Sequence, residues 1–91
     1  MNLGTIYTTA SISGISAAFN DFVMSCLSRQ EKNDYGDTCE EDKISNDYAL
    51  KNGGRILSVY NIPAELGVDE KCIWIITYPK KETTVLFPFE Y

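Results

Sequence analysis

The side chains with the clearest chemical potential are carboxylates, and most of them are concentrated in one part of the chain. Residues 31–47 contain seven acids and two bases, whereas the rest of the 91-residue chain contains six of each. This acidic segment therefore accounts for the whole net charge of −5. Carboxylates can act as general acids and bases, bind cations, or form a surface that attracts a basic partner.

Catalysis has no specific support in the spacing of these groups. A Cys or Ser nucleophile usually needs a neighbouring base, and histidine, the commonest base, is absent from the chain. The three cysteines form no CxxC pair, Asn52-Gly53-Gly54 does not have the pattern of a phosphate-binding loop, and the spacing of a calcium-binding EF-hand is missing. We therefore expect no enzymatic activity, no cofactor, no metal site and three reduced thiols.

The first candidate site is a partner-binding surface in the acidic segment. Such a surface would attract a basic protein surface, or would occupy a groove that otherwise holds nucleic acid. Direct binding of nucleic acid is not expected, because no cluster of basic residues could follow the phosphates. The alternative is a solvated helix start, since a helix dipole favours acids in the first turn. The candidate residues are Asp34, Asp37, Glu40, Glu41, Asp42 and Asp47.

The second candidate site is a polar cluster on the helix expected near residues 38–51. At about 100° per residue, Asp42, Asn46 and Ala49 share one helix face. If that face points inward, the two polar side chains need hydrogen-bond partners, and Arg55 is the expected partner for one of them. The cluster could be structural, or it could contact a ligand.

A ligand at this cluster would be a nucleotide-like signalling molecule. Trp74, Tyr60 and Tyr78 could stack on its base, and Arg55 could face a phosphate. The alternative role for the aromatic residues is packing in the core. This hypothesis includes an oligomer, because Ile75, Val85 and Phe87 could either pair two copies or lie beneath helices.

The elements expected to position these groups begin with a strand at residues 3–9, which are β-branched and aromatic. A short helix at 12–18 and a second helix from an N-cap at Asn20 to Arg29 follow. A third helix is expected to begin with a capping box, in which the Thr38 hydroxyl and Glu41 carboxylate satisfy the first amides. Asn52-Gly53-Gly54 supplies its stop.

Strands are expected at residues 55–60, 72–78 and 83–87, with a loop at 61–70. Strands joined by short connections pair antiparallel, and helices grouped in the sequence cover one face. The sequence therefore predicts an α+β fold, with N-terminal helices packed on one face of a three- to four-stranded antiparallel sheet. We expect one domain spanning residues 1–91, with the first strand at an edge of the sheet.

Residues 35–91 contain an ordered string of short motifs. They are GDxCEED from Gly36, NxxALK from Asn46, GRILSxY from Gly54, IWIIT from Ile73, TTxLxP from Thr83 and a final EY from Glu90. This string resembles a family of small uncharacterised proteins from plasmids, prophages and other mobile elements. No functional residues are carried over from this family, but the resemblance implies a protein that interferes with host defence.

Charge, composition and resemblance together predict a small acidic binding protein of a phage or mobile element. Its partner would be a basic surface on a host defence or nucleic-acid-handling complex, and its mode of action would be inhibition of the anti-CRISPR or anti-restriction type. No signal peptide and no apolar run of membrane-spanning length is seen in the sequence. We therefore expect the cytoplasm of a bacterial host cell, no membrane contact and either a monomer or a homodimer.

Overall fold

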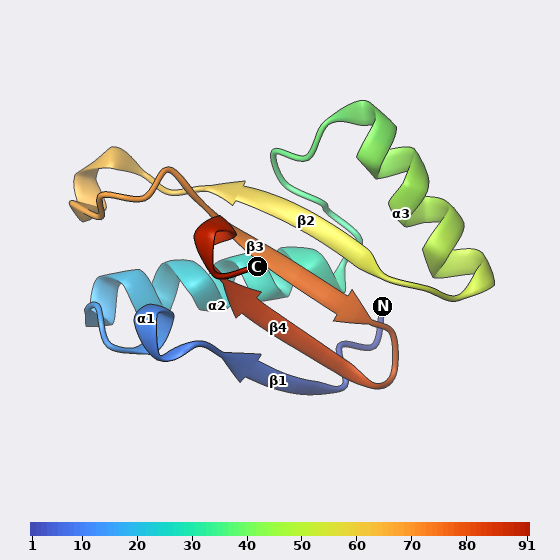
Figure 1. Ribbon diagram of the computed structural model, residues 1–91, viewed down its shortest axis with the longest axis horizontal. Helices are drawn as coiled ribbons and strands as arrows, with labels where there is room; N and C mark the ends of the chain where they lie inside the picture. Colours follow the sequence, from blue (N-terminus) through green and yellow to red (C-terminus); the bar gives the residue numbers. More distant parts are fainter.

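Four strands form one sheet in the order β1-β4-β3-β2 in the computed structural model, which describes residues 1–91 (Figure 1). The strands β2, β3 and β4 are antiparallel neighbours, as predicted. The first strand lies at the edge of the sheet, beside β4. The bounds are β1 Thr5–Thr8, β2 Ile56–Asn61, β3 Cys72–Tyr78 and β4 Glu82–Leu86. The α+β fold class is therefore confirmed.

The prediction of a purely antiparallel sheet is wrong, because β1 runs parallel to β4. Thr5 lies opposite Glu82, and Thr8 lies opposite Val85. No hairpin joins these two strands, so no short turn imposes opposite directions on them. Because β1 runs parallel to β4, it finishes at the end of the sheet where α1 and the start of α2 lie (Figure 1).

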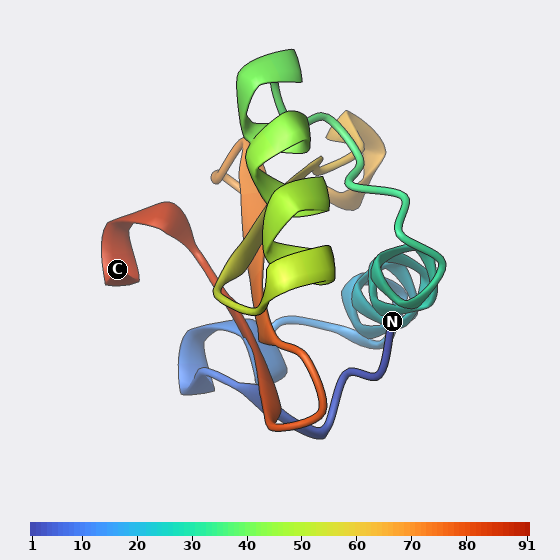
Figure 2. The same cartoon turned by 90° about the vertical axis from the view of Figure 1, so that its right-hand side faces the viewer.

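The helices take different positions around the sheet. They are α1 (Ala10–Ser13), α2 (Ala17–Glu31) and α3 (Glu40–Asn52), and the 3-10 turns are η1 (Ala64–Leu66) and η2 (Pro88–Glu90). Figure 2 shows α2 against one face of the sheet, and the C-terminal turn on the opposite side. The third helix lies beside β2, the second edge of the sheet (Figure 1). Coverage by long helices is therefore confined to the α2 face.

The boundaries of the first two helices differ from the prediction. The expected helix at 12–18 is interrupted at Gly14, where α1 ends. The second helix begins at Ala17, and its N-cap is Ser16, whose hydroxyl accepts the Phe19 amide at 3.1 Å. The predicted N-cap at Asn20 is therefore wrong. The earlier start places Phe19, which is fully buried, on the core side of α2.

The hydrophobic core fills the space between α2 and the sheet. Ile75, Val85 and Phe87 belong to this core, and the Phe87 ring stacks on Phe19 with ring centroids 6.1 Å apart. These residues therefore lie beneath a helix, and not in an interface between two copies. The opposite side, which we call the open face, carries the alternate residues Leu57, Val59, Trp74, Ile76, Tyr78 and Thr84.

A chain of buried polar side chains crosses this core. The Gln30 amide nitrogen donates to the Thr77 hydroxyl at 3.2 Å, and its oxygen lies 3.0 Å from the Tyr60 hydroxyl. The Thr77 and Thr83 hydroxyls are 2.9 Å apart, and Thr83 donates to the Leu3 carbonyl at 2.7 Å. Because a buried polar group without a partner is costly, each member depends on the next. The chain fixes α2 against β2, β3 and β4.

Thr77→Val tests this chain by removing one hydroxyl at nearly constant volume. We expect a loss of about 1–3 kcal/mol in the free energy of unfolding, because the Gln30 amide loses its acceptor in the core. Urea unfolding monitored by circular dichroism measures the change. Thr84→Val is the matched control on the open face, and should change stability by less than about 0.5 kcal/mol. Equal effects of the two substitutions would contradict a structural role for the chain.

Candidate functional site

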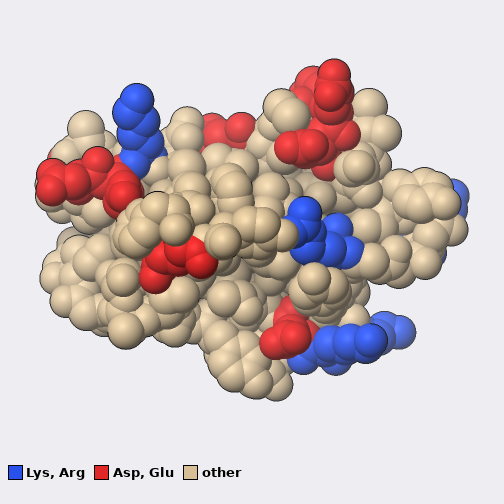
Figure 3. Space-filling model, in the orientation of Figure 1, with Lys and Arg blue, Asp and Glu red and all other residues tan.

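Acidic side chains of the acidic segment gather over the start of α3, at the upper right of Figure 3. The helix lies there because of contacts that its own residues and the preceding loop make with β2. Residues 57, 59 and 61 direct their backbone groups away from β3, because hydrogen bonding alternates along an antiparallel pair. These outward groups need partners wherever water is excluded.

Asn46 supplies the first partners. Its side-chain nitrogen donates to the Leu57 carbonyl at 2.8 Å, and its side-chain oxygen accepts the Leu57 amide at 3.1 Å. The amide group thus pairs with β2 as another strand would. Asn46 is buried, as is Ala49 one turn later, so this helix face points inward at both residues, an orientation that the sequence had left open. Asp42, at the end of the same face, remains exposed.

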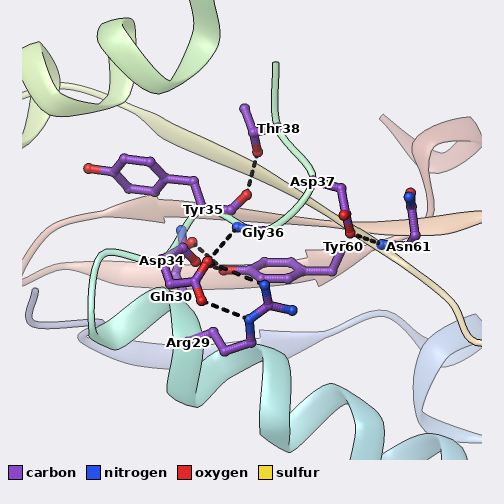
Figure 4. Close-up of polar contacts among 9 residues, drawn as sticks. All are labelled: Arg29, Gln30, Asp34, Tyr35, Gly36, Asp37, Thr38, Tyr60 and Asn61. Atoms are coloured by element: carbon purple, nitrogen blue, oxygen red, sulfur yellow. Dashed lines mark hydrogen bonds and ion pairs between the residues drawn. The ribbon is translucent and has the colours of Figure 1, made fainter. Parts of the chain in front are cut away.

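The loop before α3 covers the rest of this edge. The Asp37 amide donates to the Val59 carbonyl at 2.7 Å, and the Asp37 carboxylate accepts the Asn61 amide at 2.8 Å (Figure 4). Between them, the Thr38 hydroxyl accepts the Val59 amide at 2.9 Å. Every backbone amide that β2 directs outward at residues 57, 59 and 61 therefore has a side-chain acceptor.

This use of Thr38 overturns the predicted capping box. The helix begins one residue later, with Cys39 as N-cap and no side-chain hydrogen bond at the cap. The Thr38 hydroxyl instead accepts from β2 and donates to the Tyr35 carbonyl at 2.5 Å. The predicted stop of the helix is confirmed, since α3 ends at Asn52 and Gly53 has a φ of 87°.

Gly36 permits the loop to approach the sheet. It forms an isolated parallel bridge with Val59 and has a φ of 64°, which favours glycine. A Cβ atom at this position would lie 2.5 Å from the Tyr60 ring and from the Val59 carbonyl oxygen. The close approach lets the Tyr60 hydroxyl donate to the Asp34 carbonyl at 2.6 Å, which joins the loop to the buried polar chain (Figure 4).

Two further acids of the candidate surface have partners within the protein. The Asp34 carboxylate accepts from the Arg29 guanidinium at 3.0 Å and from the Gly36 amide at 3.0 Å, and these contacts lower the pKa of Asp34. The Asp47 carboxylate accepts the Tyr35 hydroxyl at 2.8 Å. Burial, followed by this hydrogen bond, raises the pKa of Tyr35 to about 12. With Asp37, three of the six proposed surface acids thus hold the loop and α3 in place.

The remaining three acids, Glu40, Glu41 and Asp42, lie exposed in the first turn of α3. Their one ion pair joins Glu40 to Lys43 at 3.6 Å, between exposed or half-exposed side chains, where such pairs contribute little. On the outward side of the helix, Ile44 and Tyr48 are each 69% exposed. We call Glu40, Glu41, Ile44 and Tyr48 the α3 outer face. It combines two exposed carboxylates, of which only Glu40 has an ion pair, with two large apolar groups.

The second candidate site is brought together in part. Asp42, Ser45, Asn46, Arg55 and Leu57 line a shallow notch of about 170 Å³ between α3 and β2. Arg55 is not the hydrogen-bond partner of Asn46, because the Leu57 backbone takes that place. No ion pair links it to Asp42 within 4.0 Å.

Arg55 instead contacts the C-terminal segment. Its guanidinium donates to the Tyr91 hydroxyl and lies 5.4 Å from the centroid of that ring. Trp74 meets the same ring edge-on, with centroids 5.6 Å apart. Tyr60 is fully buried beneath α2, so it cannot stack on a ligand at the open face. Of the residues proposed to contact a ligand, Arg55 and Trp74 therefore both contact the Tyr91 ring beside the notch, and Tyr60 lies apart from them in the core.

Cysteine thiols and groups of metal-binding side chains are the other features that could support chemistry. The three cysteines are free thiols, and burial raises the pKa of Cys26 to about 12. The structure contains no group of three Cys, Asp or Glu side chains placed to hold a metal ion. None of its helices has the length and apolar character needed to cross a membrane.

Comparison of the chain with models of protein families, with curated proteins and with solved structures finds no match.

Gly36→Ala tests the approach of the loop to β2. We expect a loss of about 2–4 kcal/mol in the free energy of unfolding, because the new methyl group meets both the Tyr60 ring and backbone, and because φ is positive. Gly67→Ala is the matched control: its φ is 67°, but nothing lies within 4 Å of the added Cβ. It should cost about 1–2 kcal/mol, the backbone part alone. A loss no larger at Gly36 than at Gly67 in urea unfolding would refute the close contact.

Asp37→Ala and Asp42→Ala separate the structural acids from the free ones. We expect the first to lose about 1–2 kcal/mol of stability, because the Asn61 amide loses its acceptor. The second should stay within about 0.5 kcal/mol of the parent chain. Both variants remove one negative charge from the same segment. A difference in stability between them in thermal or urea unfolding therefore reflects the position of the acid and not the change in net charge. If both lose the same stability, the coverage of the β2 edge by Asp37 is not stabilising.

Proposed function

We propose that this chain is a small non-enzymatic binding protein whose α3 outer face docks on a basic surface of a protein partner. The observation that carries the proposal is that two kinds of exposed side chain lie beside each other on α3. Glu40 and Glu41 have no structural hydrogen bond, and Ile44 and Tyr48 do not pack in the core. A solvated helix start accounts for the acids by themselves. It does not account for two large apolar side chains beside them.

The two kinds of side chain would contribute differently to binding. The carboxylates would steer a basic partner toward the helix and suppress wrong partners, and this contribution weakens as salt is added. Ile44 and Tyr48 would supply buried apolar area, and tyrosine is among the residues most enriched in interface hot spots. The helix itself is held rigidly by Asn46, so little conformational entropy would be lost on docking.

The partner class that we propose is a host defence or nucleic-acid-handling complex, inhibited by a protein of a phage or mobile element in the cytoplasm of the bacterial host. The acidic segment concentrates a net charge of −5 in residues 31–47, as a mimic of nucleic acid in a basic groove would. The resemblance of residues 35–91 to small mobile-element proteins supports the same class. Asp34, Asp37 and Asp47 would add long-range charge, while their carboxylates keep their internal partners.

Sequestration of a nucleotide-like signalling molecule is less well supported. Tyr60 lies in the core, and Arg55 is already engaged with Tyr91. The notch beside Arg55 is shallow, and Asp42 at its rim would repel a phosphate. The α3 outer face therefore carries the proposed function.

A DNA-cleavage assay tests the proposal with purified restriction and CRISPR-type nuclease complexes of bacterial hosts. We expect the chain to inhibit at least one of them, and inhibition to weaken steeply between about 50 and 300 mM salt. Glu40→Lys with Glu41→Lys should weaken inhibition by about tenfold or more, because two attractive contacts become repulsive. Tyr48→Ala should weaken it through the loss of apolar contact.

Glu65→Lys with Asp69→Lys is the matched control, because it makes the same change in net charge on an exposed loop away from α3. It should leave inhibition within about twofold of the parent chain. Equal weakening by both double variants would show that net charge alone acts, and would reject the α3 outer face. Absence of inhibition of every complex at low salt would reject the proposed partner class.

A further inference from the structure

The two edges of the sheet are treated differently. The β2 edge is covered by Asn46, Thr38 and Asp37, which satisfy its outward backbone groups. The β1 edge has no such cover: all four of its residues are exposed, and no segment of the chain lies beyond it in either view (Figures 1 and 2). An uncovered strand edge is a template for pairing with another strand.

The unpaired groups of β1 can be assigned from its pairing with β4. The Thr5 amide donates to the Lys81 carbonyl at 3.1 Å, and the Thr9 amide donates to the Val85 carbonyl at 3.2 Å. Alternation along the strand turns Tyr7 toward β4 as well, and leaves the amide and carbonyl groups of Ile6 and Thr8 directed outward. Four backbone groups, two donors and two acceptors, are thus presented by one short strand.

The composition of β1 lacks the devices that usually protect an edge. Residues 5–8 contain no charge, no proline and no bulge, and all are β-branched or aromatic. Ile6 is 46% exposed and Tyr7 is 52% exposed. The strand is therefore well suited to the pairing that its free groups permit.

We propose that β1 pairs antiparallel with β1 of a second copy of this chain, which joins two sheets into one of eight strands. The two-fold axis passes beside Tyr7, so that Ile6 of one protomer faces Thr8 of its partner. In this register the outward amides and carbonyls of both protomers all find partners across the seam. This inference is independent of the proposed function, which uses the other edge of the molecule.

The register follows from the strand itself. Pairing centred on Ile6 would require Gly4, whose φ of 65° lies outside the strand region and whose amide already donates to the Asn2 side chain at 2.9 Å. Centring on Tyr7 needs only strand residues. It also places the two Tyr7 rings side by side on the open face, in a pair without backbone hydrogen bonds, where cross-strand side chains are closest.

Charge favours a second copy in the antiparallel sense. The β1 strand starts beside residues 80–82, which carry two lysines and one glutamate, and is followed by Thr9, whose hydroxyl donates to Glu90 at 2.9 Å. Antiparallel pairing brings the net positive end of each protomer to the Glu90 end of its partner. Helix α3 and its acids stay at the outer edges, beyond β2, which lies three strand spacings or about 14 Å from the β1 strand at the seam. That distance exceeds the Debye length of about 8 Å at physiological salt.

Sedimentation equilibrium and cysteine cross-linking test the proposal with the full chain. We expect a concentration-dependent species of twice the monomer mass between about 10 µM and 1 mM. Thr8→Pro removes an outward amide and no internal hydrogen bond, so it should shift the dimer midpoint at least tenfold while the fold survives. In a Cys39→Ser, Cys72→Ser background, Tyr7→Cys should form a disulfide-linked dimer on mild oxidation, because its Cα atoms would lie about 4.5 Å apart.

Ile6→Cys in the same background is the register control, since its two copies would be offset along the strands and should cross-link far more slowly. Cross-linking at Ile6 in preference to Tyr7 would overturn the register, and with it the proposal. A chain that stays monomeric to about 1 mM would also overturn it, and would assign the β1 edge to a strand of a different protein. The cross-linking result stands even if Thr8→Pro fails to fold.

Discussion

The free edge of β2 is the constraint on which this structure depends. A strand at the end of a sheet presents unpaired amides and carbonyls, and here a loop and a helix satisfy them. Asn46 pairs with Leu57 through both atoms of its amide, and Asp37 and Thr38 complete the row. These bonds fix where α3 lies, how residues 34–38 run, and which side chains of the helix point outward.

The same constraint explains why the acidic segment is not uniform. Asp34, Asp37 and Asp47 hold the loop and helix through Arg29, the Asn61 amide and the Tyr35 hydroxyl. Glu40 and Glu41 make no such bonds and lie beside exposed apolar groups. Carboxylates with internal partners and exposed carboxylates without a structural hydrogen bond thus occur within the same seventeen residues, and charge density alone does not distinguish them.

The two sheet edges differ in how their backbone groups are satisfied. Coverage of β2 by α3 leaves the helix rigid and its outer face available, whereas β1 keeps its hydrogen-bonding groups free. The buried polar chain through Gln30 and Tyr60 connects these regions, since it ties α2, the loop at Asp34 and the central strands together. Docking at α3 and pairing at β1 would therefore occur on one rigid frame, at opposite sides, without competing for surface.

The sequence by itself determined the α+β class, the span of β3, the stop of α3 and the helix face that Asn46 and Ala49 share, because periodicity and glycine chemistry are local. Only the tertiary structure decided the parallel pairing of β1, the use of Thr38 as an edge acceptor, and the partners of Gln30, Asp37 and Arg55. Those contacts join residues 21 to 77 positions apart, and most are side-chain hydrogen bonds, whose partners no local pattern specifies.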